Sequence, residues 1–212
     1  MQLVGLLDSP FVRRVAVSLL TLRVPFEHRP VSVFRGFDAF HRLNPVVKAP
    51  TLLADDGSTL MDSSLILQYV EAVAGRGSLL PAEPAALLRA LRRIGLSLAA
   101  CEKTAQIVYE RGLRPAEKQH QPWIDRVSGQ LLAAFTGLEQ ELSAEPLDTA
   151  SAQDLGQAGI SMAVAWHFTQ QMLPQVVPAA QFPQLVALSA AAEGLAEFRA
   201  APHGEGSVTP LG

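Results

Sequence analysis

The sequence contains a single cysteine, Cys101, among its 212 residues. One cysteine cannot close a disulfide within its own chain, so a disulfide-stapled fold is excluded and a reducing, cytoplasmic setting is expected. Residues 1 to 100 contain no cysteine at all, so a Cys-x-x-Cys motif is absent there. Chemistry that needs a nucleophilic cysteine in the first half of the chain is therefore not expected.

Charge is also sparse, since charged residues make up 17% of the chain and the formal net charge is −3. The sequence has no long run of Lys or Arg, which excludes the broad positive surface that attracts nucleic acid or anionic membrane. The basic pairs Arg13-Arg14 and Arg92-Arg93 are interpreted as solvated helix faces. The five histidines show no spacing typical of metal ligands, so we expect no metal.

Long apolar runs are missing too. Charged residues or prolines interrupt each apolar stretch well before the roughly 18 residues that a membrane span requires, so no transmembrane helix is expected. No basic segment precedes an apolar one at the start of the chain, so we expect no signal peptide. Hydrophobic residues nevertheless form 49% of the sequence, which predicts a folded protein with a sizeable core.

The first 75 residues alternate between strand-like and helix-like patterns. Strands are predicted over 2–7, 26–33, 51–54 and 58–61, and helices over 10–22, 34–43 and 63–74. The last two strands flank the turn Asp55-Asp56-Gly57 and form a hairpin. The predicted order is βαβαββα, and with a proline just before the third strand it is the thioredoxin arrangement.

A different pattern follows the Gly- and Pro-rich stretch after residue 75, because every later segment has helical spacing. Helices are predicted over 85–111, 118–143 and 151–171, and one or two shorter helices within 182–201. Ser151 and Asp154 form a capping-box pattern at the start of one of them. The fold class is therefore α/β plus all-α. We expect a thioredoxin-like domain over 1–76, a linker over 77–83, an all-helical domain over 84–202 and a flexible tail over 203–212.

Candidate chemistry begins at Ser9, which lies between the first strand and the first helix. Its hydroxyl can cap the helix or donate a hydrogen bond to a bound group. A second candidate is "NPVVKAP". A cis Ala49-Pro50 bond would turn the N–H and C=O of Ala49 outward, where a peptide could pair with them, whereas a trans proline would simply begin a strand.

The third candidate is "LMDSS", which precedes a predicted helix. Ser63 stands at the N-cap position, and a helix N-terminus binds carboxylates through its free N–H groups. Asp62 adds an acceptor for a cationic amine. Asp62 and Ser63 together therefore suit an α-amino-carboxylate group.

These stretches, in their order and spacing, resemble the glutathione S-transferase family, and in particular its bacterial members with a serine at the active site. The matching motifs are "SPFVRRV", "NPVVKAP", "DSSLILQYV" and "SAQDLGQAGISMAVA", which span almost the whole chain. The resemblance implies a cis Pro50, preceded by Ala49 as the partner of the cysteinyl backbone of glutathione. It also implies that Asp62 and Ser63 hold the γ-glutamyl end.

The same resemblance implies that Ser9, or less favourably Asp8, meets the glutathione sulfur. Lys48 could reach the glycyl carboxylate or be solvated. The family has a glycine where this chain has Val47, so a positive φ there would strain Val47 or rearrange the loop.

The function implied is transfer of the glutathione thiolate to a hydrophobic electrophile. Phe11, Tyr109 and Arg111 are the candidates for its pocket. Glutathione is the co-substrate, no metal takes part, and the chain is expected to pair as a homodimer. The alternative is a non-catalytic protein of the same fold that binds a protein partner, and the departure at Val47 favours it.

Overall fold

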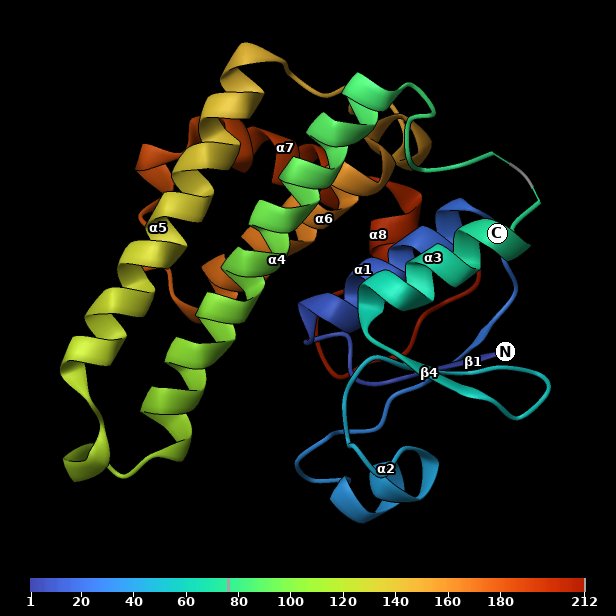
Figure 1. Cartoon of the computed structure of the whole chain (residues 1–212), viewed down its shortest axis with the longest axis horizontal. Coiled ribbons are helices and arrows are strands. Elements are labelled where there is room, and N and C mark those ends of the chain that lie inside the picture. Colours follow the sequence, from blue (N-terminus) through green and yellow to red (C-terminus); the bar gives the residue numbers. More distant parts are fainter. Residues whose placement is uncertain (76, 212) are drawn as a thin grey trace. The chain divides into compact units, whose positions relative to one another are not determined.

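The computed structural model describes residues 1–75 and 77–211, which form two compact units (Figure 1). One unit combines residues 1–79 with residues 193–212, and the other contains residues 80–192. The first is an α/β unit and the second is helical, as the sequence predicts.

A four-stranded mixed sheet forms the centre of the first unit, in the order β2-β1-β3-β4. Its strands are β1 (Gln2–Val4), β2 (Glu27–Arg29), β3 (Thr51–Leu53) and β4 (Thr59–Met61). β1 pairs in parallel with β2, while β3 runs antiparallel to both β1 and β4. This topology is the predicted thioredoxin-like arrangement.

Helices α1 (Pro10–Thr21) and α3 (Ser63–Val73) pack against each other over one face of the sheet, and α2 (Phe37–Leu43) lies beyond the other face (Figure 1). The layer between helices and sheet is apolar. Leu3, Val15, Leu52 and Ile66 are all fully buried there. The loops that carry Ser9, Ala49 and Asp62, which adjoin β1, β3 and β4, are thus built on a packed core.

The end of the chain belongs to the first unit, which differs from the predicted helical domain over 84–202. Helix α8 (Ala196–Ala200) packs against α1. Arg13, which is 1% exposed, donates from both Nη atoms to the Glu193 carboxylate at 2.6 and 2.7 Å, and from Nε to the carbonyl of Ala201 at 2.8 Å. A guanidinium with these partners lies inside the fold, so the interpretation of Arg13 as solvated is wrong.

The segment after α8 is also attached, whereas the sequence predicts a flexible tail over 203–212. The N–H of Thr209 donates to the carbonyl of Ala200 at 2.8 Å, and Arg35 forms an ion pair with Glu205. Backbone and side-chain bonds together therefore give this segment a defined course. The predicted boundaries at residues 76 and 212 lie outside the described residues.

The second unit contains α4 (Pro84–Leu113), α5 (Gln121–Ala144), α6 (Ala152–Met172) and most of α7 (Pro183–Glu193). Two short 3₁₀ turns, Ala116–Lys118 and Ala179–Gln181, connect them. Helix α4 packs against both α5 and α6. Trp166 is buried and packs against the rings of Phe135 and Phe182, whose centroids lie 5.3 and 5.6 Å from its own.

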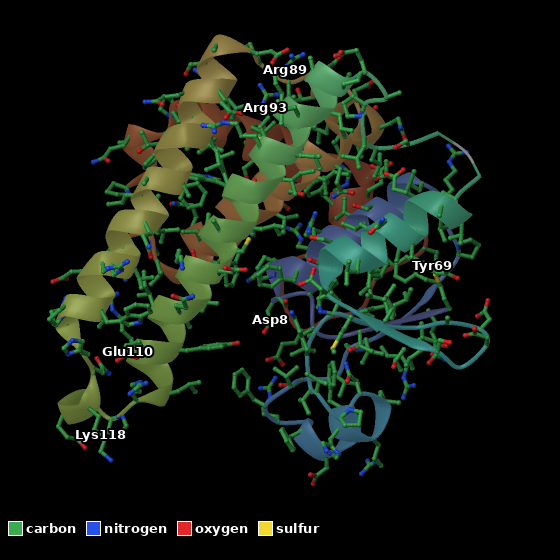
Figure 2. All side chains as sticks on the ribbon, in the orientation of Figure 1. Asp8, Tyr69, Arg89, Arg93, Glu110 and Lys118 are labelled. Carbon is green, nitrogen blue, oxygen red and sulfur yellow. The ribbon has the colours of Figure 1, made fainter. Side chains whose placement is uncertain are left out.

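Polar side chains form a helix cap at one place in this unit and ion pairs to a buried arginine at another. The Ser151 hydroxyl accepts the N–H of Asp154 at 3.1 Å, which is the cap expected at the start of α6. Near one end of α4, Arg93 is 5% exposed and contacts Glu141 and Glu145 of the α5 end (Figure 2). The interpretation of Arg93 as solvated is therefore also wrong, while its neighbour Arg92 is 66% exposed.

Candidate functional site

Ser9 is the N-cap residue of α1, and its carbonyl accepts the N–H of Arg13 at 2.9 Å. Pro10 follows at the first helical position, where a missing N–H costs nothing. The Ser9 side chain is half-buried, and its hydroxyl hydrogen-bonds to none of the described residues. The Ser9 side chain therefore makes no capping hydrogen bond to α1, and its hydroxyl remains available to a bound group.

Asp8, the less favoured candidate, lies next to Ser9 at the turn before α1 (Figure 2). Partial burial raises the pKa of its carboxyl, and the negative charge of Glu205 acts in the same direction. The N–H of Ser9 and the guanidinium of Arg35 oppose this shift. A carboxylate cannot donate a hydrogen bond to a thiolate, whereas a hydroxyl can, so Ser9 stays the favoured candidate for that role.

Ala49 lies two residues before β3, and the Ala49–Pro50 peptide bond is cis. The N–H and C=O of Ala49 hydrogen-bond to none of the described residues. Gly5 packs closely beside it, because a Cβ added at Gly5 would lie 3.1 Å from the Cβ of Ala49. The turn that carries Ser9 and the segment that carries Ala49 are therefore in contact.

Val47 has a φ of +52°, in the left-handed region that a β-branched residue rarely adopts. Its N–H donates to the carbonyl of Asn44 at 2.9 Å, which holds the loop in this turn. The loop thus keeps a glycine-type conformation without a glycine, and the strain falls on Val47.

We expect the substitution Val47→Gly to raise the free energy of unfolding by about 1 kcal/mol. Release of the left-handed strain contributes about 1–2 kcal/mol, and the greater freedom of glycine in the unfolded chain offsets part of it. Urea denaturation measures the change. Val46→Gly, at an exposed neighbour without a positive φ, should instead lower stability, and equal effects of the two variants would contradict the assignment of strain.

Asp62, not Ser63, is the N-cap of α3, which corrects the sequence prediction. Its carboxylate accepts the N–H of Ser64 at 2.8 Å, and its φ is +64°. Ser63 is the first helical residue, and its side chain is buried. The prediction failed because either residue type can cap a helix, and only the backbone conformation decides which one does.

Arg14 is the hydrogen-bond partner of the buried Ser63 side chain. The residue is 3% exposed, and Nη1 donates to the hydroxyls of Ser63 at 3.1 Å and Ser64 at 3.3 Å. Arg14 was interpreted from sequence as solvated, and this is wrong. Its only sequence signal is its place in the motif "SPFVRRV". It brings a buried positive charge beside the N-terminus of α3.

Lys48 contacts Asp62, with 3.2 Å between Nζ and Oδ2. Burial opposes the charged form of Asp62, but the N–H of Ser64 and the Lys48 ammonium outweigh it, so the pKa of Asp62 lies below its usual value. The Arg14 guanidinium adds to this effect. A carboxylate that stays charged is suited to hold a cationic amine.

The residues predicted for the co-substrate pocket lie on two helices. Phe11 is half-buried in the first turn of α1, while Tyr109 and Arg111 are exposed near the end of α4. Their joint role stays a prediction. Cys101 is buried within α4. Over residues 1–75 and 77–211, no cluster of three metal-ligating side chains occurs, and no helix has the length and apolarity of a membrane span.

Comparison with known proteins agrees with this architecture. Residues 3–78 match the family model "Glutathione S-transferase, N-terminal domain". The chain is 30% identical over 132 residues to the uncharacterized GST-like protein YibF of Escherichia coli K12. That match covers 62% of this chain and 61% of the relative's length.

Two solved structures are similar along most of the chain. A glutathione transferase family member from Pseudomonas fluorescens Pf-5 with bound glutathione is 28% identical, with a TM-score of 0.82, over 94% of this chain and 97% of that one. A glutathione S-transferase from Methylobacterium radiotolerans in complex with glutathione sulfonate is 25% identical, with a TM-score of 0.82, over 93% and 92%. The first unit therefore matches the N-terminal domain of the glutathione S-transferases, and the whole chain is similar in structure to solved glutathione transferases.

Proposed function

We propose that the protein is a glutathione transferase in which Ser9 stabilises the glutathione thiolate. The observation that carries the proposal is the Ser9 hydroxyl, which stands at the N-terminus of α1 and is not used to cap it. A helix N-terminus favours negative charge, and the hydroxyl supplies a directed donor.

The magnitudes are sufficient for this role. A free thiol has a pKa of about 8.5, and one pKa unit corresponds to about 1.4 kcal/mol. A charge-assisted hydrogen bond and the helix dipole together supply roughly one to two such units. A thiol pKa of about 6.5–7.5 would make roughly a quarter to three quarters of bound glutathione thiolate at pH 7, against about 3% for the free thiol. Its sulfur donates an electron pair to the electrophilic carbon, and the leaving group departs with the pair of the broken bond.

The remaining residues serve to bind glutathione in this proposal. The N–H and C=O of Ala49, just before Pro50, pair with the cysteinyl backbone. Asp62 and Ser63 hold the γ-glutamyl amine and carboxylate, and Lys48 is the candidate partner of the glycyl carboxylate. The conformation of Val47 supports this proposal over the non-catalytic alternative, because the loop keeps its glycine-type turn despite the substitution. The reducing cytoplasm, where thiols remain free, is the proposed location.

Replacement of Ser9 tests the proposal. Ser9→Ala should raise the thiol pKa of bound glutathione by about one unit and lower the rate at neutral pH. Stability should change by less than about 0.5 kcal/mol, because no capping bond is lost. The measurement is thiolate absorbance against pH with glutathione at saturation.

Ser9→Thr is the matched control, since it keeps the donor and should retain part of the effect. Equal titration curves for the wild type and Ser9→Ala would overturn the catalytic role. Calorimetry with glutathione separates the alternative, because a protein-interaction module without a glutathione site would give no binding heat.

We also propose a homodimer, in line with the resemblance. Leu65, Tyr69 and Val73 form an exposed apolar stripe at helical spacing on α3, where Figure 2 marks Tyr69. Light scattering should give twice the chain mass of 22.7 kDa. Tyr69→Glu should shift the equilibrium toward the single chain, and a wild-type mass of one chain at micromolar concentration would contradict the proposal.

A further inference from the structure

His28, which no role above requires, joins the Ser9 turn to the end of the chain. Its Nε2 lies 2.8 Å from the carbonyl oxygen of Gly5, and its Nδ1 accepts the N–H of Val208 at 3.1 Å. An N–H can only donate, so Nδ1 carries no proton. The proton is therefore on Nε2, which donates to the carbonyl of Gly5.

Gly5 has a backbone conformation and close neighbours that leave no room for a side chain. It follows β1 directly and has a φ of +138°, which side-chain-bearing residues rarely adopt. An added Cβ would meet Val12 of α1 at 2.6 Å and Ala49 at 3.1 Å. The hydrogen bond from His28 orients the Gly5 carbonyl, and with it the peptide plane from which the turn toward Ser9 departs.

The tautomer of His28 depends on the chain end. Val208 is placed by its neighbour Thr209, whose N–H bonds to the carbonyl of Ala200, and by the ion pair between Glu205 and Arg35. Burial lowers the pKa of His28, although the carbonyl of Gly5 opposes this shift. The neutral ring can keep one donor and one acceptor, as these two bonds require.

We propose that His28 is a positioning residue for the Ser9 hydroxyl, and that the segment 203–211 holds it in the tautomer that does so. This inference rests on the proposed function, since it concerns the thiolate partner of that site. A residue that only fastened the chain end would affect stability but would leave the thiol acidity of bound glutathione unchanged.

Two amide variants separate the bonds of His28. His28→Gln places an amide near Nε2 and can keep the bond to Gly5, while His28→Asn places one near Nδ1 and can keep the bond from Val208. We expect His28→Asn to raise the thiol pKa of bound glutathione by about half of the Ser9→Ala shift, and His28→Gln to stay close to the wild type. Thermal unfolding of each variant is recorded alongside.

Val208→Pro provides a second, milder test because it removes the N–H that fixes the tautomer and leaves His28 in place. Val208→Ala keeps that N–H and is its control. Val208→Pro should raise the thiol pKa relative to Val208→Ala, by less than His28→Asn does. This variant decides the question if His28→Asn fails to fold.

The outcomes are distinguishable. Unchanged thiol pKa values in His28→Asn and Val208→Pro, beside a shifted Ser9→Ala, would overturn the positioning role and leave the proposed function intact. A Ser9→Ala curve equal to the wild type would overturn both. A shift in His28→Asn that His28→Gln does not share supports the inference.

Discussion

Replacement of Arg13 by methionine should lower the free energy of unfolding by about 3–5 kcal/mol. The guanidinium forms a bidentate hydrogen-bonded ion pair with Glu193 and donates to the carbonyl of Ala201. It also lies 5.6 Å from the centre of the Phe198 ring. Methionine fills part of the volume but leaves a partly buried carboxylate and a carbonyl without their donor. Urea denaturation of purified variants measures the loss.

A matched pair of controls isolates burial as the cause. Arg92→Met removes a guanidinium from an ion pair with Glu141 that is 66% exposed on the arginine side, and it should cost at most about 1 kcal/mol. Glu193→Gln keeps a hydrogen-bond acceptor and should fall between the two. If Arg13→Met costs no more than Arg92→Met, the bonds to Glu193 contribute no more than a surface pair does.

Replacement of Arg14 by methionine should reduce both stability and glutathione affinity. Hydrogen bonds to charged groups contribute about 1.5–3 kcal/mol each, and Ser63 would keep a buried hydroxyl without its charged donor. We expect a stability loss of about 2–3 kcal/mol and roughly a tenfold weaker binding of glutathione, or about 1.4 kcal/mol. The pKa of Asp62 should also rise, because a neighbouring positive charge is removed.

Calorimetry with glutathione and urea denaturation measure these two effects separately. Ser64→Ala is the control, since it removes the weaker of the two hydroxyl partners and keeps Arg14 against Ser63. It should preserve most of the affinity. Undiminished glutathione binding by folded Arg14→Met would show that Arg14 supports the fold without arranging Ser63 for the ligand.

The order of elements was predictable because each depends on local spacing. The hairpin strands and the helix over 63–73 lie within a residue or two of their predicted ends. The first two strands were predicted too long, over 2–7 and 26–33. Leu7 is fully buried although it lies in the turn after β1, so burial there does not accompany strand pairing.

The buried arginines were not predictable in the same way. Arg13 finds Glu193 at a distance of 180 positions along the chain, and Arg14 finds Ser63 at 49. No local pattern distinguishes such an arginine from a solvated one, because its partners arrive only with the tertiary fold. The candidates Ser9, Ala49 and Asp62 could be named from the sequence because each lies in a motif of adjacent residues, and their part in binding stays a prediction.

The first unit consists of two segments that lie far apart in the sequence, so a ribosome synthesises them at different times. Residues 80–192 emerge as one continuous run, while the first unit waits for residues 193–212. At about 5–20 residues per second, the 113 residues between the two parts take about 6–23 seconds to synthesise. During that interval Arg13 has no Glu193 and α1 has no α8 beside it. The first unit therefore becomes complete only after the segment that contains Glu193 and α8 has been added.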